Sequence, residues 1–336
     1  MGSNSFGLAR LRFVAQGSVI FAASLFGWNA VAQQARLPDY PNKLVRILSL
    51  VPAGGLSDIA LRPLTQALSE QTGQTFIVEN RPGGGGLVEG RACAHAAPDG
   101  YVICNVDNEV VSNPDFLFKD VGYNTQKDFA AITNGYYIIN GFVASSELNV
   151  KNLNDLIALS KSRPEGINVA TPATSLQIFV QSFAKHTGAN FHVIPYKSGA
   201  EVANGLLTNA VQAAAVGLGN ALPLIQAGEM KALSVDSAER TPLLPDVPTL
   251  KEMNFDSLRI KSWYGFVAPT GTPKSIISFL HDSIVNFYSR ADIRQRVLIN
   301  AALEPIFNTP EEFAQFLIVD RERTAAEVKL VGIEPQ

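Results

Sequence analysis

The stretch that decides the fold is LVRILSLVPAGGLSD, residues 44–58. Its first eight residues are mostly apolar and include β-branched side chains, which is typical of a buried strand. The sequence PAGG at 52–55 ends this strand, and Ser57 or Asp58 then begins a helix that Gly73 ends. Because a buried strand runs through a glycine loop into a helix, we expect an α/β sheet whose parallel strands are joined by helices.

The same alternation of strands and helices continues along the chain. Further strands are expected at 76–79, 101–106, 140–144, 168–170, 192–194, 211–216, 231–235 and 263–268. Helices are expected between them, at 87–97, 152–163, 176–187, 199–208, 220–227 and 273–290, and after a capping box at 309–312. A second set of elements begins near residue 140, so the sequence predicts two successive α/β units.

The N-terminus has the pattern of a signal peptide. Arg10 and Arg12 precede an apolar stretch at 13–26, and Ala30 and Ala32 form a small-x-small cleavage site. We expect cleavage after Ala32. The alternative is an uncleaved membrane anchor, although the apolar run is short for the roughly 20 residues that a spanning helix needs. The sequence therefore predicts an exported protein in the periplasm.

Composition excludes several classes of protein. The chain has 336 residues, 46% of them hydrophobic, a length that suits two domains better than one. Its formal net charge is −3 and no basic run occurs, so we expect no nucleic-acid partner. Four His and two Cys offer little material for a metal site. We therefore expect no bound metal.

The two cysteines, Cys93 and Cys104, lie late in an expected helix and in the following expected strand. The chain reverses between them, so a disulfide stays open. A helix packed on a sheet is usually held further away than the Cα spacing of about 7 Å that a disulfide allows. This argument favours two buried free thiols.

Motifs of catalysis are absent from the sequence. The glycines at 83–86 and 90 do not complete the dinucleotide fingerprint, and no Gly-Lys-Ser/Thr phosphate loop occurs. Residues 55–59, GLSDI, resemble half of a nucleophile elbow, but Ile59 stands where glycine is needed. We expect Ser57 to cap a helix, and we expect no catalytic residue and no cofactor.

Three loops have the character of anion-binding loops. They are 53–55, 171–175 and 217–220, and each joins an expected strand to an expected helix. The start of a helix offers unpaired N–H groups and a partial positive charge, and glycine lets a ligand approach the backbone. Ligands of open α/β sheets bind beyond the carboxyl ends of the strands, where these loops lie. In an exported chain without catalytic groups, this favours a binding protein.

From Tyr40 to the C-terminus the chain resembles the Bug receptors, which are the periplasmic solute-binding proteins of tripartite tricarboxylate transporters. The segments that carry the resemblance are YPNK (40–43), PAGGLSD (52–58), VENRPGG (78–84), AAPDGY (96–101), VIPYK (193–197), AG (227–228), LPDVPT (244–249), SWYG (262–265), APTGTP (268–273) and TPEEF (309–313).

The resemblance implies a two-lobed α/β clamshell of the periplasmic-binding-protein, or Venus flytrap, class. Each lobe is then a mostly parallel sheet flanked by helices, and two crossover strands join the lobes. We expect the first lobe at 33–142 and 267–336 and the second at 143–266, with crossings near 142–143 and 264–266. A hinge at these crossings would let the lobes close around a ligand.

The resemblance also implies where the ligand binds. Backbone N–H groups of the first glycine loop and of the second-lobe Ser/Thr loop hold a small carboxylate between the lobes. The expected ligand-binding residues are Ala53, Gly54, Gly55, Ser57, Asp58, Glu109, Thr171, Ala173, Thr174, Ser175, Tyr196, Gly219, Asn220 and Trp263. Among them the backbone donors of Gly54 and Gly55 are the expected anchor.

Three positions depart from the family pattern. The loop at 171–177 lacks the glycines and the histidine that relatives usually have. Gly219 stands where relatives often carry an aspartate, and residues 107–109, DNE, include two acids where relatives commonly have small neutral side chains. These departures lie in loops that the resemblance assigns to the ligand, so they bear on the ligand and not on the expected fold.

Glu109 bears on the class of ligand. Two carboxylates about 4 Å apart repel each other by roughly 4 kcal/mol at an effective dielectric of 20. A tricarboxylate is therefore not expected, and a small organic acid, an amino acid or a pyridine-type ligand suits Glu109 better. The alternative, that Glu109 points to solvent and selects nothing, stays open.

These observations together predict a monomeric periplasmic receptor. It would deliver its ligand to the membrane subunits of a tripartite tricarboxylate transporter. One alternative is a receptor that reports ligand binding to a signalling partner. The other alternative is an exported enzyme on the same scaffold.

Overall fold

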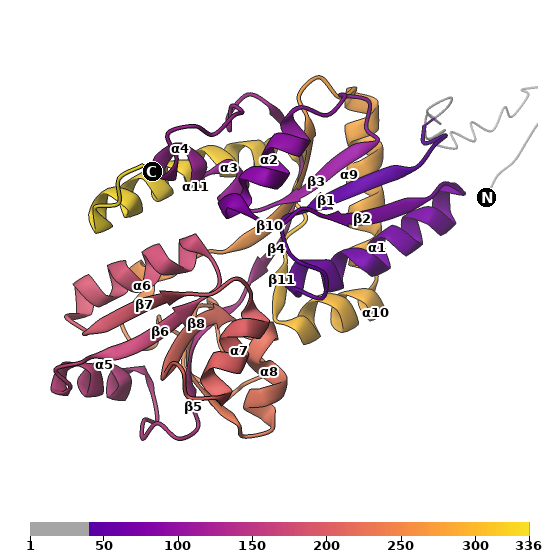
Figure 1. The fold of residues 1–336 in the computed structure, drawn as a ribbon. Helices are drawn as coiled ribbons and strands as arrows, with labels where there is room; N and C mark the ends of the chain where they lie inside the picture. The colour runs from indigo at the N-terminus through magenta and orange to yellow at the C-terminus, as the bar shows by residue number, and fades with distance from the viewer. Residues whose placement is uncertain (1–39, 336) are drawn as a thin grey trace, which may run out of the picture. The chain divides into compact units, whose positions relative to one another are not determined.

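Two mixed sheets, each flanked by helices, form the part of the chain that the computed structural model describes, residues 40–335 (Figure 1). The predicted signal peptide and its cleavage site lie outside the described residues. None of the helices within 40–335 is long and apolar enough to cross a membrane. The predicted two-lobed class of fold is confirmed.

The first sheet has the strand order β11-β4-β10-β3-β1-β2. β1 pairs in parallel with β2 and β3, whereas β10 pairs antiparallel with β3 and β4, and β11 pairs antiparallel with β4. The sheet is therefore mixed rather than mostly parallel. Its strands are β1 (Val45–Ser49), β2 (Phe76–Asn80), β3 (Val102–Val106), β4 (Phe129–Ile138), β10 (Trp263–Pro269) and β11 (Leu303–Pro305).

The second sheet has the strand order β7-β6-β8-β5-β9. β6 pairs in parallel with β7 and β8, and β5 pairs antiparallel with β8 and β9, so this sheet is mixed too. Its strands are β5 (Asn140–Ser145), β6 (Ile167–Thr171), β7 (Phe191–Pro195), β8 (Ala213–Gly217) and β9 (Met230–Val235).

The chain passes from the first sheet to the second at Ile139, between β4 and β5. It returns through residues 236–262 and enters the first sheet with β10. Phe142 and Val143 thus pair within the second sheet. We call each sheet with its flanking helices a lobe. The lobe limits at 142/143 and 266/267 stay predictions, because strand pairing does not show which residues move together.

The helices end where the sequence supplies a cap. Gly73, Gly188 and Gly332 end three helices in the left-handed conformation that favours glycine. The first-lobe helices are α1 (Leu56–Thr72), α2 (Leu87–Ala94), α3 (Asn108–Val111), α4 (Pro114–Leu117), α9 (Lys274–Ser289), α10 (Ala291–Ile293) and α11 (Pro310–Val331). The second-lobe helices are α5 (Leu153–Ser162), α6 (Thr174–Thr187), α7 (Gly199–Leu207) and α8 (Leu218–Gln226).

Each lobe has its own apolar core. Ile47, Leu61 and Tyr136 lie fully buried in the first lobe, between the sheet and its helices. In the second lobe Phe142 on β5 packs against Phe183 on α6, with ring centroids 5.0 Å apart. Burial of such side chains is the main favourable contribution to folding. Because each lobe has its own core, the loops between the two sheets are not needed to join the cores and can form a site.

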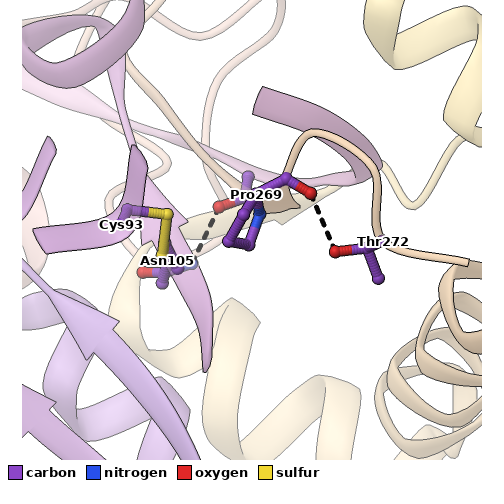
Figure 2. Close-up of a disulfide and its surroundings, with 6 residues drawn as sticks. Cys93, Asn105, Pro269 and Thr272 are labelled. Carbon is purple, nitrogen blue, oxygen red and sulfur yellow. Dashed lines mark hydrogen bonds between the residues drawn. A yellow bond between two sulfur atoms is a disulfide. The ribbon is translucent and has the colours of Figure 1, made fainter. Parts of the chain in front are cut away.

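Cys93 and Cys104 form a disulfide between α2 and β3, with Cα atoms 6.3 Å apart (Figure 2). The expectation of two free thiols is therefore wrong. It compared a disulfide's reach with the distance of a helix axis, but a residue on the inner face of a helix lies about 2.3 Å nearer to the sheet than the axis does. Figure 2 also shows Asn105, which follows Cys104 on β3.

Candidate ligand-binding site

A cavity of about 280 Å³ lies between loops of the two lobes. Its first-lobe wall comes from the loops after β1 and β3 and from the start of β10. Its second-lobe wall comes from the loops after β6, β7 and β8. These loops follow the carboxyl ends of parallel strands, which is where ligands bind in α/β sheets.

Four helices of nine or more residues, besides the short helix α3, begin at this cavity. The lining includes Gly55 and Leu56 at the start of α1, Ala173 and Ser175 at α6, residues 198–200 at α7, and Gly217 and Asn220 at α8. Helix starts carry N–H groups without intrahelical partners and a partial positive charge. The cavity is therefore built to receive a group with negative charge.

The backbone N–H groups of Gly54 and Gly55 already have hydrogen-bond acceptors in the protein. The Gly54 N–H donates to Asp58 Oδ2 at 2.9 Å, and the Gly55 N–H donates to Pro52 O at 3.0 Å. Both N–H groups predicted as the anchor are thus already paired in this structure. Within residues 40–335 no acceptor pairs with the N–H groups of Leu56 and Ser57, so the free donors of this helix start lie just beyond the glycines.

Glycine at 55 is required by the loop itself. A Cβ at this position would collide with the Val51 side chain and would lie 3.1 Å from Pro52 O. A valine at 55 would therefore rebuild the loop whether or not a ligand binds. The variant Gly55→Val would therefore not show whether Gly55 contacts the ligand.

Asp58 and Ser57 lie behind the cavity wall. Asp58 is buried, and its carboxylate accepts hydrogen bonds from Gly54, from Arg62 (2.7 and 3.0 Å) and from Asn80 (3.0 Å). Burial alone would raise the pKa of Asp58, but these donors outweigh it and lower the pKa. The Ser57 hydroxyl donates to Asn105 Oδ1. Both predicted site residues therefore support the loop and do not line the cavity.

The acidic loop after β3 does line the cavity. Glu109 is only 6% exposed, and its Oε1 accepts a hydrogen bond of 2.9 Å from the Ser175 N–H across the cavity. Burial raises the pKa of Glu109, and the N–H groups of Ser175 and Thr174 oppose that rise. Asp107 caps α3 by accepting from the Glu109 N–H at 2.8 Å, and burial together with the Glu109 charge raises its pKa. Glu109 thus faces the second lobe rather than solvent.

The remaining predicted residues divide into two groups. Ala53, Gly54, Gly55, Ala173, Ser175, Asn220 and Trp263 line the cavity with Glu109. Thr171 is buried beside it, Thr174 reaches the Glu109 carboxylate, and Tyr196 lines a separate hollow on α7. Gly219 packs against the backbone of Ala301 and the side chain of Leu56, so a Cβ there would clash. That contact is the reason why Gly219 is not in the lining.

Sequence reasoning missed the loop between β7 and α7. Lys197, Ser198 and Gly199 line the cavity, and Lys197 is exposed to solvent at its edge. The Ser198 side chain caps α7 by accepting from the Glu201 N–H at 3.2 Å. The signal was available, because this loop joins a strand to a helix as the three predicted loops do.

The charges at the cavity fit a small polar molecule. Asp107, Glu109 and Lys197 are the ionisable side chains in its lining apart from Tyr264. No group of three or more metal-ligating side chains occurs within residues 40–335. The arrangement can hold an anionic group at the helix starts and a hydrogen-bond donor near the two acids.

Known proteins are similar to this chain in sequence and fold. A family model described as the tripartite tricarboxylate transporter family receptor matches residues 60–333. A curated protein of Cupriavidus necator, named for its place in the 5′ region of gbd, is 29% identical over 334 residues, which cover 97% of this chain and 99% of that protein.

Two solved structures have the same fold over most of the chain. One is Rpa4515 of R. palustris with adipate, which is 26% identical with a TM-score of 0.83 and covers 89% of this chain and 100% of that chain. The other is the periplasmic binding protein BugD, which is 27% identical with a TM-score of 0.81 and covers 88% of this chain and 100% of that chain. Sequence and fold thus agree, and the chain belongs to the family of tripartite tricarboxylate transporter receptors, the periplasmic solute-binding proteins that include the Bug proteins.

Proposed function

We propose that this protein is a periplasmic receptor that captures a small carboxylate between its lobes. It acts as a monomer and delivers the ligand to the membrane subunits of a tripartite tricarboxylate transporter. The observation that carries the proposal is the convergence of helix starts from both lobes on one cavity of about 280 Å³. Helix starts on both walls let a single anionic group hold the lobes together.

The proposed ligand class is a small organic acid, an amino acid or a pyridine-type acid. Its carboxylate lies at the free N–H groups of α1 and α7, near the cation of Lys197. Its remaining part faces Asp107 and Glu109, which accept hydrogen bonds from an N–H or O–H group. The adipate in Rpa4515 supports a small carboxylate as the class.

The proposed contact residues form two groups. The first was expected from the sequence and also lines the cavity: Ala53, Gly54, Gly55, Glu109, Ala173, Ser175, Asn220 and Trp263. The second lines the cavity but was not expected from the sequence: Leu56, Lys197, Ser198 and Gly199. Export after cleavage behind Ala32 belongs to the same proposal. The disulfide between Cys93 and Cys104 supports export, because disulfides persist in oxidising compartments.

A thermal-shift screen of the mature chain tests this function. The screen covers monocarboxylates, dicarboxylates, citrate, amino acids and pyridine carboxylates, and its hits are measured by calorimetry. A true ligand at 100 times its dissociation constant adds about 2.7 kcal/mol of stability, which is a clear shift in melting temperature.

Lys197→Ala and Lys329→Ala form the matched pair of variants for this screen. Lys197 lines the cavity, whereas Lys329 is exposed near the end of α11. We expect Lys197→Ala to weaken binding and Lys329→Ala to leave it unchanged. A screen without any stabilising acid contradicts the receptor, and conversion of a bound acid into product favours the exported enzyme.

A further inference from the structure

The start of α6 lacks a cap of its own. Its N-cap residue is Ala173, which has no side-chain oxygen to accept from the first N–H groups of the helix. By contrast α5, α7 and α11 are capped by Asn152, Ser198 and Thr309 from their own loops. Uncapped N–H groups at a buried helix start need an acceptor from elsewhere.

That acceptor is Glu109 from the other lobe. Its Oε1 accepts from the Ser175 N–H at 2.9 Å, and Ser175 is the second residue of α6. Both Glu109 and Ser175 are buried, so water competes little for this charge-assisted hydrogen bond. The Glu109 carboxylate therefore takes the place that a bound anion would take at this helix start.

The backbone of Glu109 is fixed on the first-lobe side. Its N–H donates to Asp107 at 2.8 Å. Gly86, with φ +87°, approaches so closely that a Cβ there would lie 2.7 Å from Glu109 O. Glu109 thus projects from a rigid corner between α3 and the 3₁₀ turn Gly84–Gly86, and little conformational freedom is lost when its carboxylate meets α6.

Other contacts also hold α6 against the first lobe. Leu117 on α4, Ile178 on α6 and Val328 on α11 form one buried apolar cluster. Further along α6, Lys185 Nζ donates to the carbonyl oxygens of Leu330 (3.0 Å) and Val331 (3.2 Å) at the end of α11. The hydrogen bond of Glu109 is therefore the cavity-side end of a longer contact between the lobes.

We propose that the Glu109 carboxylate acts as a built-in anion at the start of α6. It latches the two lobes together and prevents a carboxylate of the ligand from binding at this helix start. The part that concerns the ligand rests on the proposed function. A ligand then places one carboxylate at the starts of α1 and α7. A second carboxylate would compete with Glu109 for the α6 donors and would be repelled by its charge. Glu109 is thus a specificity-determining residue that favours a monocarboxylate over the dicarboxylate of the same length.

The latch is tested without any ligand. Amide hydrogen exchange at Thr174 and Ser175 and the radius of gyration from small-angle scattering are measured on the mature protein, on Glu109→Ala and on Glu109→Gln. We expect Glu109→Ala to speed exchange of the Ser175 amide at least tenfold and to expand the protein. Glu109→Gln keeps a neutral acceptor and should fall between the two; it also serves if the alanine variant does not fold.

Glu322→Gln is the matched control, because Glu322 is exposed on α11 and is not part of the cavity lining. This variant should behave as the wild type does in both measurements. Exchange and radius of gyration that are equal in wild type and both Glu109 variants would overturn the latch.

The selectivity is tested with hexanoate and adipate, which differ in the second carboxylate. Calorimetry should show that wild type prefers hexanoate and that Glu109→Ala shifts the affinity ratio at least tenfold toward adipate. An unchanged ratio with measurable binding contradicts the selectivity but keeps the receptor. If neither protein binds either acid, the preference for a straight-chain monocarboxylate is overturned, the thermal-shift screen alone decides the receptor, and the exchange measurement alone decides the latch.

Discussion

At the scale of single residues, the polar side chains beside the cavity mostly hold backbone in place. Asp58 pairs with the glycine loop, Asp107 and Ser198 cap short helices, and Glu109 meets the α6 N–H groups. Sequence reasoning placed Asp58 and Ser57 at the ligand because they stand in the right loop. A sequence does not show whether a side chain in a loop turns toward the cavity or back to the backbone.

The first prediction concerns Asp58. Its carboxylate is buried and accepts two hydrogen bonds from Arg62 and one each from Gly54 and Asn80. Asp58→Asn removes the charge and turns an amide donor toward these donors, so we expect a loss of about 2–3 kcal/mol in the free energy of unfolding at pH 7, measured by urea denaturation.

The pH dependence gives this prediction its control. Because the folded-state pKa of Asp58 is lowered, its contribution is present above the unfolded pKa of about 3.9 and is lost as the pH falls through the folded value. The difference between wild type and Asp58→Asn should therefore shrink below about pH 3.9. A difference that is constant down to pH 2 would show that packing, and not charge, causes the loss.

At the scale of elements, local signals predicted the helices of eight residues or more and missed the short helices α3, α4 and α10 and one long strand. The capping box predicted at 309–312 is present, with Thr309 and Glu312 each accepting from the backbone of the other. β4 was missed, because Asn134 and Gly135 interrupt its pattern like a turn. The structure accommodates them opposite irregular pairing at Gly265, where neighbouring strands absorb the break. Such compensation lies in distant residues and leaves no local signal.

The second prediction concerns the disulfide that ties α2 to β3. Cys93 and Cys104 are 11 positions apart, and closing a loop of this size stabilises the folded state by about 3 kcal/mol through the unfolded chain. Reduction should lower the urea midpoint accordingly. The double variant Cys93→Ala/Cys104→Ala should show no further response to reductant, and titration of two free thiols in the unreduced unfolded protein would refute the bond.

At the scale of the whole molecule, the order of strands and helices predicted two α/β units, and the family resemblance implied two lobes with a site between them. The rule that ligands bind beyond the carboxyl ends of strands indicated the loops after β1, β6 and β8, which line the cavity, and it applies equally to the loop with Lys197. It failed for Gly219, because the contact of this residue with Ala301 joins parts of the chain that are distant in sequence. Contacts between lobes depend on how two finished units meet, which no local pattern contains.

The last prediction concerns the place where the chain passes between the lobes. Asn140, just after the first crossing, donates from its backbone N–H and its side chain to the two oxygens of Asp236 at 2.7 and 2.9 Å. Asp236 follows β9, at the start of the returning segment, and its N–H donates to Asn140 O at 2.9 Å. Burial raises the pKa of this carboxyl to about 7, although the Asn140 hydrogen bonds oppose the rise.

A raised carboxyl pKa means that the folded protein holds a proton that the unfolded chain has already released. Between about pH 4 and pH 7 the stability of the wild type should therefore fall as the pH rises, by up to about 1.4 kcal/mol per pH unit from Asp236 alone. The asparagine of Asp236→Asn does not titrate, so the free energy of unfolding of this variant should fall less steeply over that window.

Denaturation series from pH 4 to 8 measure both slopes, with Glu322→Gln as the exposed control. Buried Glu89, Asp107 and Glu109 also have raised pKa values and add to the slope in both proteins, so the difference between the two series isolates Asp236. Parallel curves would mean that Asp236 remains ionised at the crossing, held by Asn140 against the cost of burial.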